Sequence, residues 1–410
     1  MNEETEIEKR EQAPVIDGEE QTLSTDGEEQ ARVLTQDVPV FDVQEPEEAS
    51  TPVELTEQGP FPSNISVSAQ EVMPAQGVMQ TTEAVPDKNE KKSLRQRIRR
   101  VTSQVFYGVD LYLFMFTALQ GILYLEYSFA AGLSGGILSP EPSDFFYGVF
   151  VVIATIAALC LGSLYFSGKA ERGVLFERPN VCQEIFEVKE RPGPGKLIAF
   201  AGLIFLLQIL FSFVTGIFEL IFNYFGYTLE YSEAMNAEYN TSWTLFLYAV
   251  VLGPLAEEVI YRGFLMHGLK GHGRRFAILV SAFVFGMMHG DFQQTMFTMA
   301  IGLILGYVAM RYSLWYALLL HIFNNGILGE LWVWAIGKMS DELYIGLLIG
   351  LLILCAILTV WLIRKGWKGM KAYLAYDRTM PGAWGSLVNL WFILFLAFSI
   401  TEIVFSISPM

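Results

Sequence analysis

The stretch Ala256-Glu-Glu-Val-Ile-Tyr-Arg-Gly263 decides the fold, because it places three charged side chains inside an apolar run. The run extends from about residue 243 to residue 266, which is long enough to cross a bilayer as a helix. Charged groups are costly in hydrocarbon, so those retained within a spanning helix normally pair with one another or serve a function. Glu257, Glu258 and Arg262 therefore predict a membrane helix that carries a polar site.

The composition of the whole chain also favours a membrane protein. The chain has 410 residues, of which 52% are hydrophobic, and its mean hydropathy is +0.38. Its net charge of −16 comes from residues 1–87, which hold 21 acidic and three basic residues and leave +2 for the remainder. Cys160, Cys182 and Cys355 suggest neither a disulfide framework nor a cysteine metal site. No nucleic-acid partner and no cleaved signal peptide are expected.

The chain divides into three regions. Residues 1–87 are rich in Glu, Gln, Pro, Ser and Thr, and we expect them to form a disordered acidic tail. Residues 88–104 form a basic juxtamembrane segment that favours the cytoplasmic side and contact with anionic lipid. Residues 105–410 form an all-α membrane domain, a multi-spanning helical bundle of about nine transmembrane helices. Its apolar segments lie at roughly 106–127, 145–167, 197–222, 243–266, 276–289, 293–311, 314–336, 343–364 and 385–407.

The charges of the connecting loops predict the orientation. Basic residues gather between the second and third segments, between the fourth and fifth, and between the eighth and ninth. The intervening loops hold few, and residues 223–242 hold no Lys or Arg. This alternation predicts a cytoplasmic N-terminus and an outside C-terminus, with Glu257 to Arg262 toward the cytoplasmic half of their helix.

The fourth segment carries the first polar set. Glu258 and Arg262 are four residues apart, so they share a helix face and can pair. Glu257 points about 100° away and is the less compensated carboxylate, which suits a general base. Pro254 removes a backbone hydrogen bond one turn earlier and can distort the helix there. The alternative is an ion pair that only locks helix packing.

Two further polar sets follow in later segments. Phe285 precedes His289 by one turn, and we expect it to fix the turn that carries the histidine. His321 and Asn325 are four apart and should point into one space, with Asn324 as a possible substitute for Asn325. Both side chain types can donate hydrogen bonds to an oxyanion, although polar residues also join membrane helices structurally.

Outside these sets, Gly302 and Gly306 predict close helix packing. His267 and His272, in a basic loop, are expected to be solvated.

Together the three polar sets favour one shared intramembrane cavity over three separate packing features. The residues then indicate that Glu257 and His289 place a water molecule, while His321 and Asn325 face an oxyanion. This arrangement predicts hydrolysis of an amide or ester inside the membrane.

These residues resemble the CAAX protease and bacteriocin-processing family of intramembrane proteases, also called CPBP or Abi, which includes the prenyl-protein CAAX endopeptidase. The family pattern is Glu-Glu-x-x-x-Arg, Phe-x-x-x-His and His-x-x-x-Asn, and it is matched at Glu257-Glu258 with Arg262, Phe285 with His289, and His321 with Asn325. The resemblance covers roughly residues 197–336.

The resemblance implies a cavity open to the cytoplasmic leaflet and a catalytic set of Glu257, Glu258, Arg262, His289, His321 and Asn325. Glu257 would be the base, His289, His321 and Asn325 the oxyanion donors, and Glu258 with Arg262 their supports. The cofactor stays open between none and zinc, with Glu257, His289 and His321 as candidate ligands. The expected partners are the lipid bilayer and a membrane-associated peptide or protein, either prenylated or of bacteriocin type.

The expected location is a bacterial plasma membrane. Two other functions remain open at this point. One is a non-catalytic membrane partner in bacteriocin self-immunity or in the regulation of a sensor kinase or surface protein. The other, weaker, is an ion-coupled transporter, which would require inverted repeats that the chain does not show.

Overall fold

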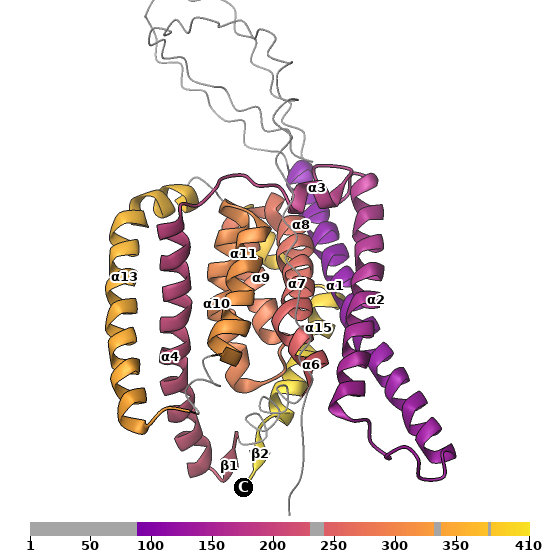
Figure 1. Ribbon diagram of the computed structural model, residues 1–410. Coiled ribbons are helices and arrows are strands. Elements are labelled where there is room, and N and C mark those ends of the chain that lie inside the picture. The colour runs from indigo at the N-terminus through magenta and orange to yellow at the C-terminus, as the bar shows by residue number, and fades with distance from the viewer. Residues whose placement is uncertain (1–87, 230–241, 332–337, 376–378) are drawn as a thin grey trace, which may run out of the picture. The chain divides into compact units, whose positions relative to one another are not determined.

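The computed structural model describes residues 88–410 except for 230–241, 332–337 and 376–378, and it is built almost entirely of helices (Figure 1). This confirms the predicted all-α class. The predicted acidic tail, residues 1–87, lies outside the described residues. The long helices are α1 (Lys88–Leu133), α2 (Asp144–Glu171), α4 (Pro194–Tyr224), α10 (Phe292–Arg311) and α13 (Asp341–Ala375). The shorter helices are α3 (Val181–Ile185), α9 (Arg274–Met287), α11 (Leu314–Ile322), α14 (Ala383–Ser386) and α15 (Leu390–Phe405).

A composite helix spans Trp243–His272 and carries the first polar set. Its parts are α6 (Trp243–Leu247), η2 (Tyr248–Leu252), α7 (Gly253–Glu257), η3 (Glu258–Met266), α8 (His267–Leu269) and η4 (Lys270–His272). The segments η2 and η3 are π-helical, so the distortion predicted at Pro254 takes the form of widened turns on both sides of α7. Such widened turns are common at functional sites.

Every apolar segment predicted from the sequence coincides with a helix in the described part of the chain, but the count of nine spans is not confirmed. Six of the described helices are long and apolar enough to cross a membrane. Helix α9 has 14 residues and rises only about 21 Å, short of the ~30 Å hydrocarbon thickness. Helix α15, with 16 residues, is also short, and α11 leads into the π-helical η5 (Phe323–Leu331), which ends the described residues there.

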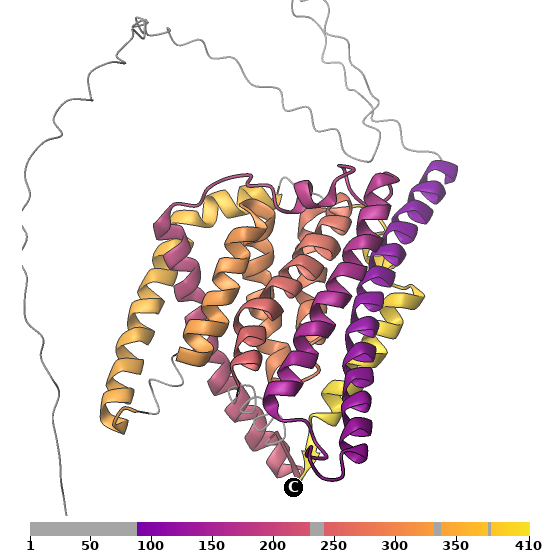
Figure 2. The same cartoon turned by 45° about the vertical axis from the view of Figure 1, so that its right-hand side comes forward.

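The basic segments lie at one end of the helices. The start of α1, the connection from α2 to α4, the turn from η4 to α9 and the end of α13 share that end (Figures 1 and 2). Lys270 joins two of these segments through ion pairs to Glu184 at 3.0 Å and Glu177 at 3.1 Å. At the opposite end, β1 (Tyr227–Thr228) pairs antiparallel with β2 (Ser408–Pro409) next to the C-terminus. This distribution matches the predicted alternation of loop charge.

The basic segment predicted at 88–104 forms the first turns of the 46-residue helix α1. Glu257 lies near the middle of the Trp243–His272 helix, and Arg262 lies toward the end that carries the basic loops. The membrane side that this end faces stays a prediction.

Helices α9 and α10 pack closely at the glycines that the sequence singled out. A Cβ added to Gly302 would lie 3.0 Å from the Ala282 Cα, and one added to Gly306 would lie 3.3 Å from an Ile278 methyl carbon. Both predicted packing glycines are therefore confirmed as points of close approach. The contact matters for the site, because α9 carries Phe285 and leads into His289.

Gly302→Ala is expected to destabilise the fold by about 1–3 kcal/mol, because the new methyl group meets the α9 backbone. The matched control is Gly346→Ala on α13, where an added Cβ meets nothing within 4 Å. That control should be neutral or stabilising by up to about 1 kcal/mol, since alanine favours helices over glycine. Thermal unfolding in detergent compares the two variants. Equal midpoints would contradict the packing assigned to Gly302.

Candidate active site

The predicted site residues come from the composite helix, from the end of α9 and from α11 with the segment that follows it. Glu257 ends α7 and Glu258 begins η3, while His321 lies near the end of α11. Segment η3 contacts both α9 and α11 in the folded chain. The structure therefore brings the first polar set against the helices that carry the other two.

A continuous chain of polar contacts forms the centre of the site. The Arg262 Nη1 lies 2.9 Å from the Glu258 Oε1, and both side chains are fully buried. The same Glu258 oxygen lies 2.9 Å from the Nδ1 of His321. The Nε2 of His321 lies 3.4 Å from the Glu257 Oε2. The ion pair predicted between Glu258 and Arg262 is confirmed, while the link from Glu258 to His321 was not predicted.

The charges of this chain balance with a single shared proton. Glu258 accepts from the Nδ1–H of His321, so the second nitrogen of the ring, Nε2, faces Glu257. A carboxylate cannot donate, so a proton must lie either on His321 Nε2 or on Glu257 for these two groups to hydrogen-bond. With that proton, two carboxylates, one guanidinium and one imidazole sum to zero net charge. Neutrality is what a buried cluster in a membrane requires.

Glu257 is the accessible carboxylate of the pair. Its side chain keeps 17% of its surface exposed, whereas that of Glu258 keeps none. Glu258 is committed to Arg262 and His321, so Glu257 alone can meet a water or a substrate. This difference supports the roles predicted from the helical spacing.

Phe285 organises the aromatic wall of the site. The Arg262 guanidinium carbon lies 3.9 Å from the centre of the Phe285 ring, which stabilises the buried cation. The rings of His289 and His321 meet Phe285 edge-on, with centroids 4.9 Å and 5.6 Å away. Phe285 thus holds both histidines, which extends its predicted packing role.

The protonation of His289 follows from its backbone contact. Its Nδ1 lies 2.7 Å from the Phe285 carbonyl oxygen, so Nδ1 must carry a hydrogen and donate. In neutral His289 the other ring nitrogen, Nε2, is then an acceptor. An acceptor suits the orientation of a water molecule, whereas donation to an oxyanion requires a protonated ring.

Asn325 is already bonded within the protein. Its Nδ2 donates to the Ala249 carbonyl oxygen at 2.9 Å, and its Oδ1 accepts from Asn324 Nδ2 at 3.0 Å. The carboxamide nitrogen has two hydrogens, so one of them remains for a further acceptor. The carbonyl of Ala249 lies in the π-helical η2, and no side chain signal in the sequence could have identified it.

The residues do not form a three-ligand metal site in this arrangement. Among the described residues, no group of three or more His, Cys, Asp or Glu side chains is placed to hold a metal ion. The Nδ1 of His321 is already bonded to Glu258, at 2.9 Å. Glu257, His289 and His321, the predicted candidate ligands, therefore do not fit a shared zinc ion as they stand.

The prediction that His267 and His272 are solvated is wrong, since both are 1% exposed. His267 Nδ1 donates to the Arg262 carbonyl at 2.7 Å, and its Nε2 accepts from Lys189 Nζ at 3.2 Å. Lys189 is exposed as a whole residue, but burial of its ammonium group beside His267, with the nearby charge of Lys270, lowers the pKa of Lys189 to about 8. These contacts anchor η3, the segment that carries Arg262, at its end next to His267.

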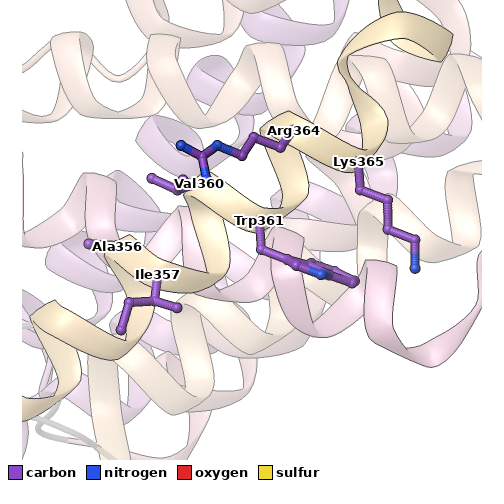
Figure 3. Close-up of a pocket in the computed structure, with 6 residues that line it drawn as sticks. All are labelled: Ala356, Ile357, Val360, Trp361, Arg364 and Lys365. Atoms are coloured by element: carbon purple, nitrogen blue, oxygen red, sulfur yellow. The ribbon is translucent and has the colours of Figure 1, made fainter.

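A hollow of about 780 Å³ lies elsewhere, along α13 (Figure 3). The side chains of Trp361, Arg364 and Lys365 line it, and the charged groups of Arg364 and Lys365 point away from each other. It is formed by one helix and contains none of the predicted site residues. It is therefore not the active-site cavity.

Comparison with known proteins agrees with the class that this site defines. Residues 239–327 match the family model of the type II CAAX prenyl endopeptidase Rce1-like proteins. The match includes all six predicted site residues and confirms the resemblance seen in the motifs. It supports a CAAX-type intramembrane protease at the level of the family. The curated proteins and the solved structures gave no match.

Glu258→Gln is expected to lower the stability of the fold by about 3–5 kcal/mol, because it leaves the buried Arg262 cation uncompensated. The double variant Glu258→Gln with Arg262→Met should recover part of that loss. Thermal unfolding in detergent measures both. Glu187→Gln is the control, because it breaks an exposed pair with Arg178 and should cost less than about 1 kcal/mol. A similar small loss for Glu258→Gln would contradict the central role of the buried pair.

Proposed function

We propose that this protein is an intramembrane endopeptidase that hydrolyses a peptide bond in a membrane-associated substrate, of prenylated or bacteriocin type. The observation that carries the proposal is the chain of contacts Arg262–Glu258–His321–Glu257, in which one carboxylate is buried and committed while the other stays accessible. A purely structural ion pair would need Glu258 and Arg262 alone. The added His321 and the accessible Glu257 supply an acid–base pair next to it.

The reaction begins with His321 protonated and Glu257 ionised, the arrangement in which Glu257 can act as a base. Glu257 takes a proton from a water molecule while the water oxygen bonds to the carbonyl carbon of the scissile peptide. The oxyanion that forms accepts hydrogen bonds from His321 Nε2–H and from the second amide hydrogen of Asn325. The carbon–nitrogen bond then breaks, and the proton on Glu257 moves to the leaving amine nitrogen. One water is consumed, and a carboxylic acid and an amine are formed.

His289 orients the attacking water in this proposal. Its neutral ring offers Nε2 as an acceptor, because Nδ1–H is held by the Phe285 carbonyl. This role differs from the oxyanion donation implied by the family resemblance. No step requires a metal, since Glu257 can accept the proton of water directly.

We further propose a bacterial plasma membrane as the location, with the basic ends of the helices in the cytoplasm. Four basic segments at one end support this orientation through the preference of Lys and Arg loops for the cytoplasm. The substrate bond would then lie at mid-membrane depth near Glu257, reached from that side.

Glu257→Gln is expected to abolish turnover while leaving the protein inserted and folded, because the amide cannot accept a proton from water. The measurement compares new peptide termini in membranes from cells that carry wild-type protein or the variant at equal levels. Termini that disappear with the variant would identify the substrates.

Glu171→Gln, at the exposed end of α2, is the matched control and should retain the wild-type set of termini. Unchanged termini in Glu257→Gln, together with an unchanged cellular phenotype, would refute the proteolytic role. That result would favour the alternative of a non-catalytic membrane partner.

A further inference from the structure

A second site lies between α1 and α15, apart from the candidate active site. A hollow of about 420 Å³ lies alongside the contact between the two helices, and its lining includes Tyr107, Asp110 and Phe114 from α1 and Trp391, Leu394 and Phe398 from α15. None of the predicted catalytic residues lines it. Helix α15 also lies outside the residues that match the family model.

Asp110 is the unexplained group in this hollow. Its Oδ2 is buried and has no hydrogen-bond partner among the described residues. The hollow contains no Lys, Arg or His that could pair with it. A buried polar oxygen without a partner is costly, and an intramembrane carboxyl group usually marks a binding or transport function.

The two helices run in the same direction, so residues near the start of each helix line one end of the hollow and later residues line the other. Thr102 of α1 lies 2.7 Å from Ser386 of α14, just before α15, and the rings of Tyr107 and Trp391 meet at 4.7 Å. These contacts lie toward the basic end of the helices. Phe114 and Phe398 line the hollow further along both helices. Asp110 thus lies just beyond an aromatic rim, and the lining beyond it is apolar except for Thr117.

We propose that this hollow binds a long-chain lipid alcohol, whose hydroxyl donates to Asp110 Oδ2 while its chain lies along Phe114, Leu394 and Phe398. The volume falls in the range of small-molecule sites, about 300–1,000 Å³. A plain hydrocarbon chain would leave the Asp110 oxygen without a donor. An ammonium group would lose its hydration beneath the aromatic rim, and its desolvation free energy is far larger than that of a hydroxyl.

The experiment uses the full-length protein in lipid nanodiscs and three photoreactive probes of equal chain length. One is an alcohol, one is its methyl ether and one is the corresponding amine. Peptide mass spectrometry maps the labelled residues. The alcohol should label the facing segments of α1 and α15 about tenfold more than the ether, because only the alcohol can donate to Asp110.

Variants test whether Asp110 is the group responsible. Asp110→Leu should lower alcohol labelling about tenfold, to the level of the ether. Asp110→Asn should largely retain it, since the amide oxygen still accepts. Glu126→Leu changes an exposed carboxylate on the same helix and should leave labelling unchanged. Circular dichroism checks that each variant is folded.

Equal labelling by alcohol and ether would overturn the proposal and leave an apolar groove filled by ordinary lipid. Stronger labelling by the amine would also overturn it, in favour of a cationic ligand. The labelling measurements do not depend on proteolysis. The lipid-binding proposal is therefore tested separately from the proposed enzyme function.

Discussion

The buried contact between Glu258 and Arg262 is the interaction on which the rest of the site depends. Both side chains are fully buried, at a depth where neither charge could exist alone. Compensation of the pair requires η3 to place both groups on one face and α9 to bring the Phe285 ring against the guanidinium. His321 of α11 joins the pair, because its Nδ1 lies 2.9 Å from the same Glu258 oxygen that contacts Arg262. One ion pair thereby fixes the relative positions of three helical elements.

The same interaction makes two adjacent carboxylates, Glu257 and Glu258, differ in their contacts and exposure. Glu258 is held on two sides and cannot leave its partners without exposing a buried cation. Glu257, one residue earlier and about 100° around the helix, keeps a face toward open space. Two identical side chains thus acquire different roles through their partners alone. The widened turns of η2 precede α7, which ends at Glu257, and those of η3 begin at Glu258.

Local spacing made the core of this site predictable from sequence. Residues four apart on a helix share a face, which was enough to pair Glu258 with Arg262 and to place Phe285 next to His289. Apolar length located the long helices but not the short α3 and α14, and small residues marked the α9–α10 contact at Gly302. The catalytic roles of Glu257, His289, His321 and Asn325 stay predictions.

Contacts between distant segments could not be derived in this way. The carbonyl of Ala249 that holds Asn325 is a backbone group with no sequence signature. The burial of His267 depends on Lys189, which lies far away in the chain, so a histidine within a basic loop was wrongly expected to be solvated. The count of nine spans is not confirmed, since α9 is followed closely by α10 and is too short to cross a bilayer alone.

The central claim is that His321 is held between Glu258 and Glu257, and histidine-selective ¹⁵N NMR tests it most directly. The chain has only four histidines, so each ring can be assigned by substitution. The account predicts that Glu257→Gln shifts the His321 Nε2 resonance, while its Nδ1–H to Glu258 and the rings of His267 and His272 stay unchanged. A His321 Nε2 resonance that is indifferent to Glu257→Gln would show that the two groups are not in contact and would contradict the account.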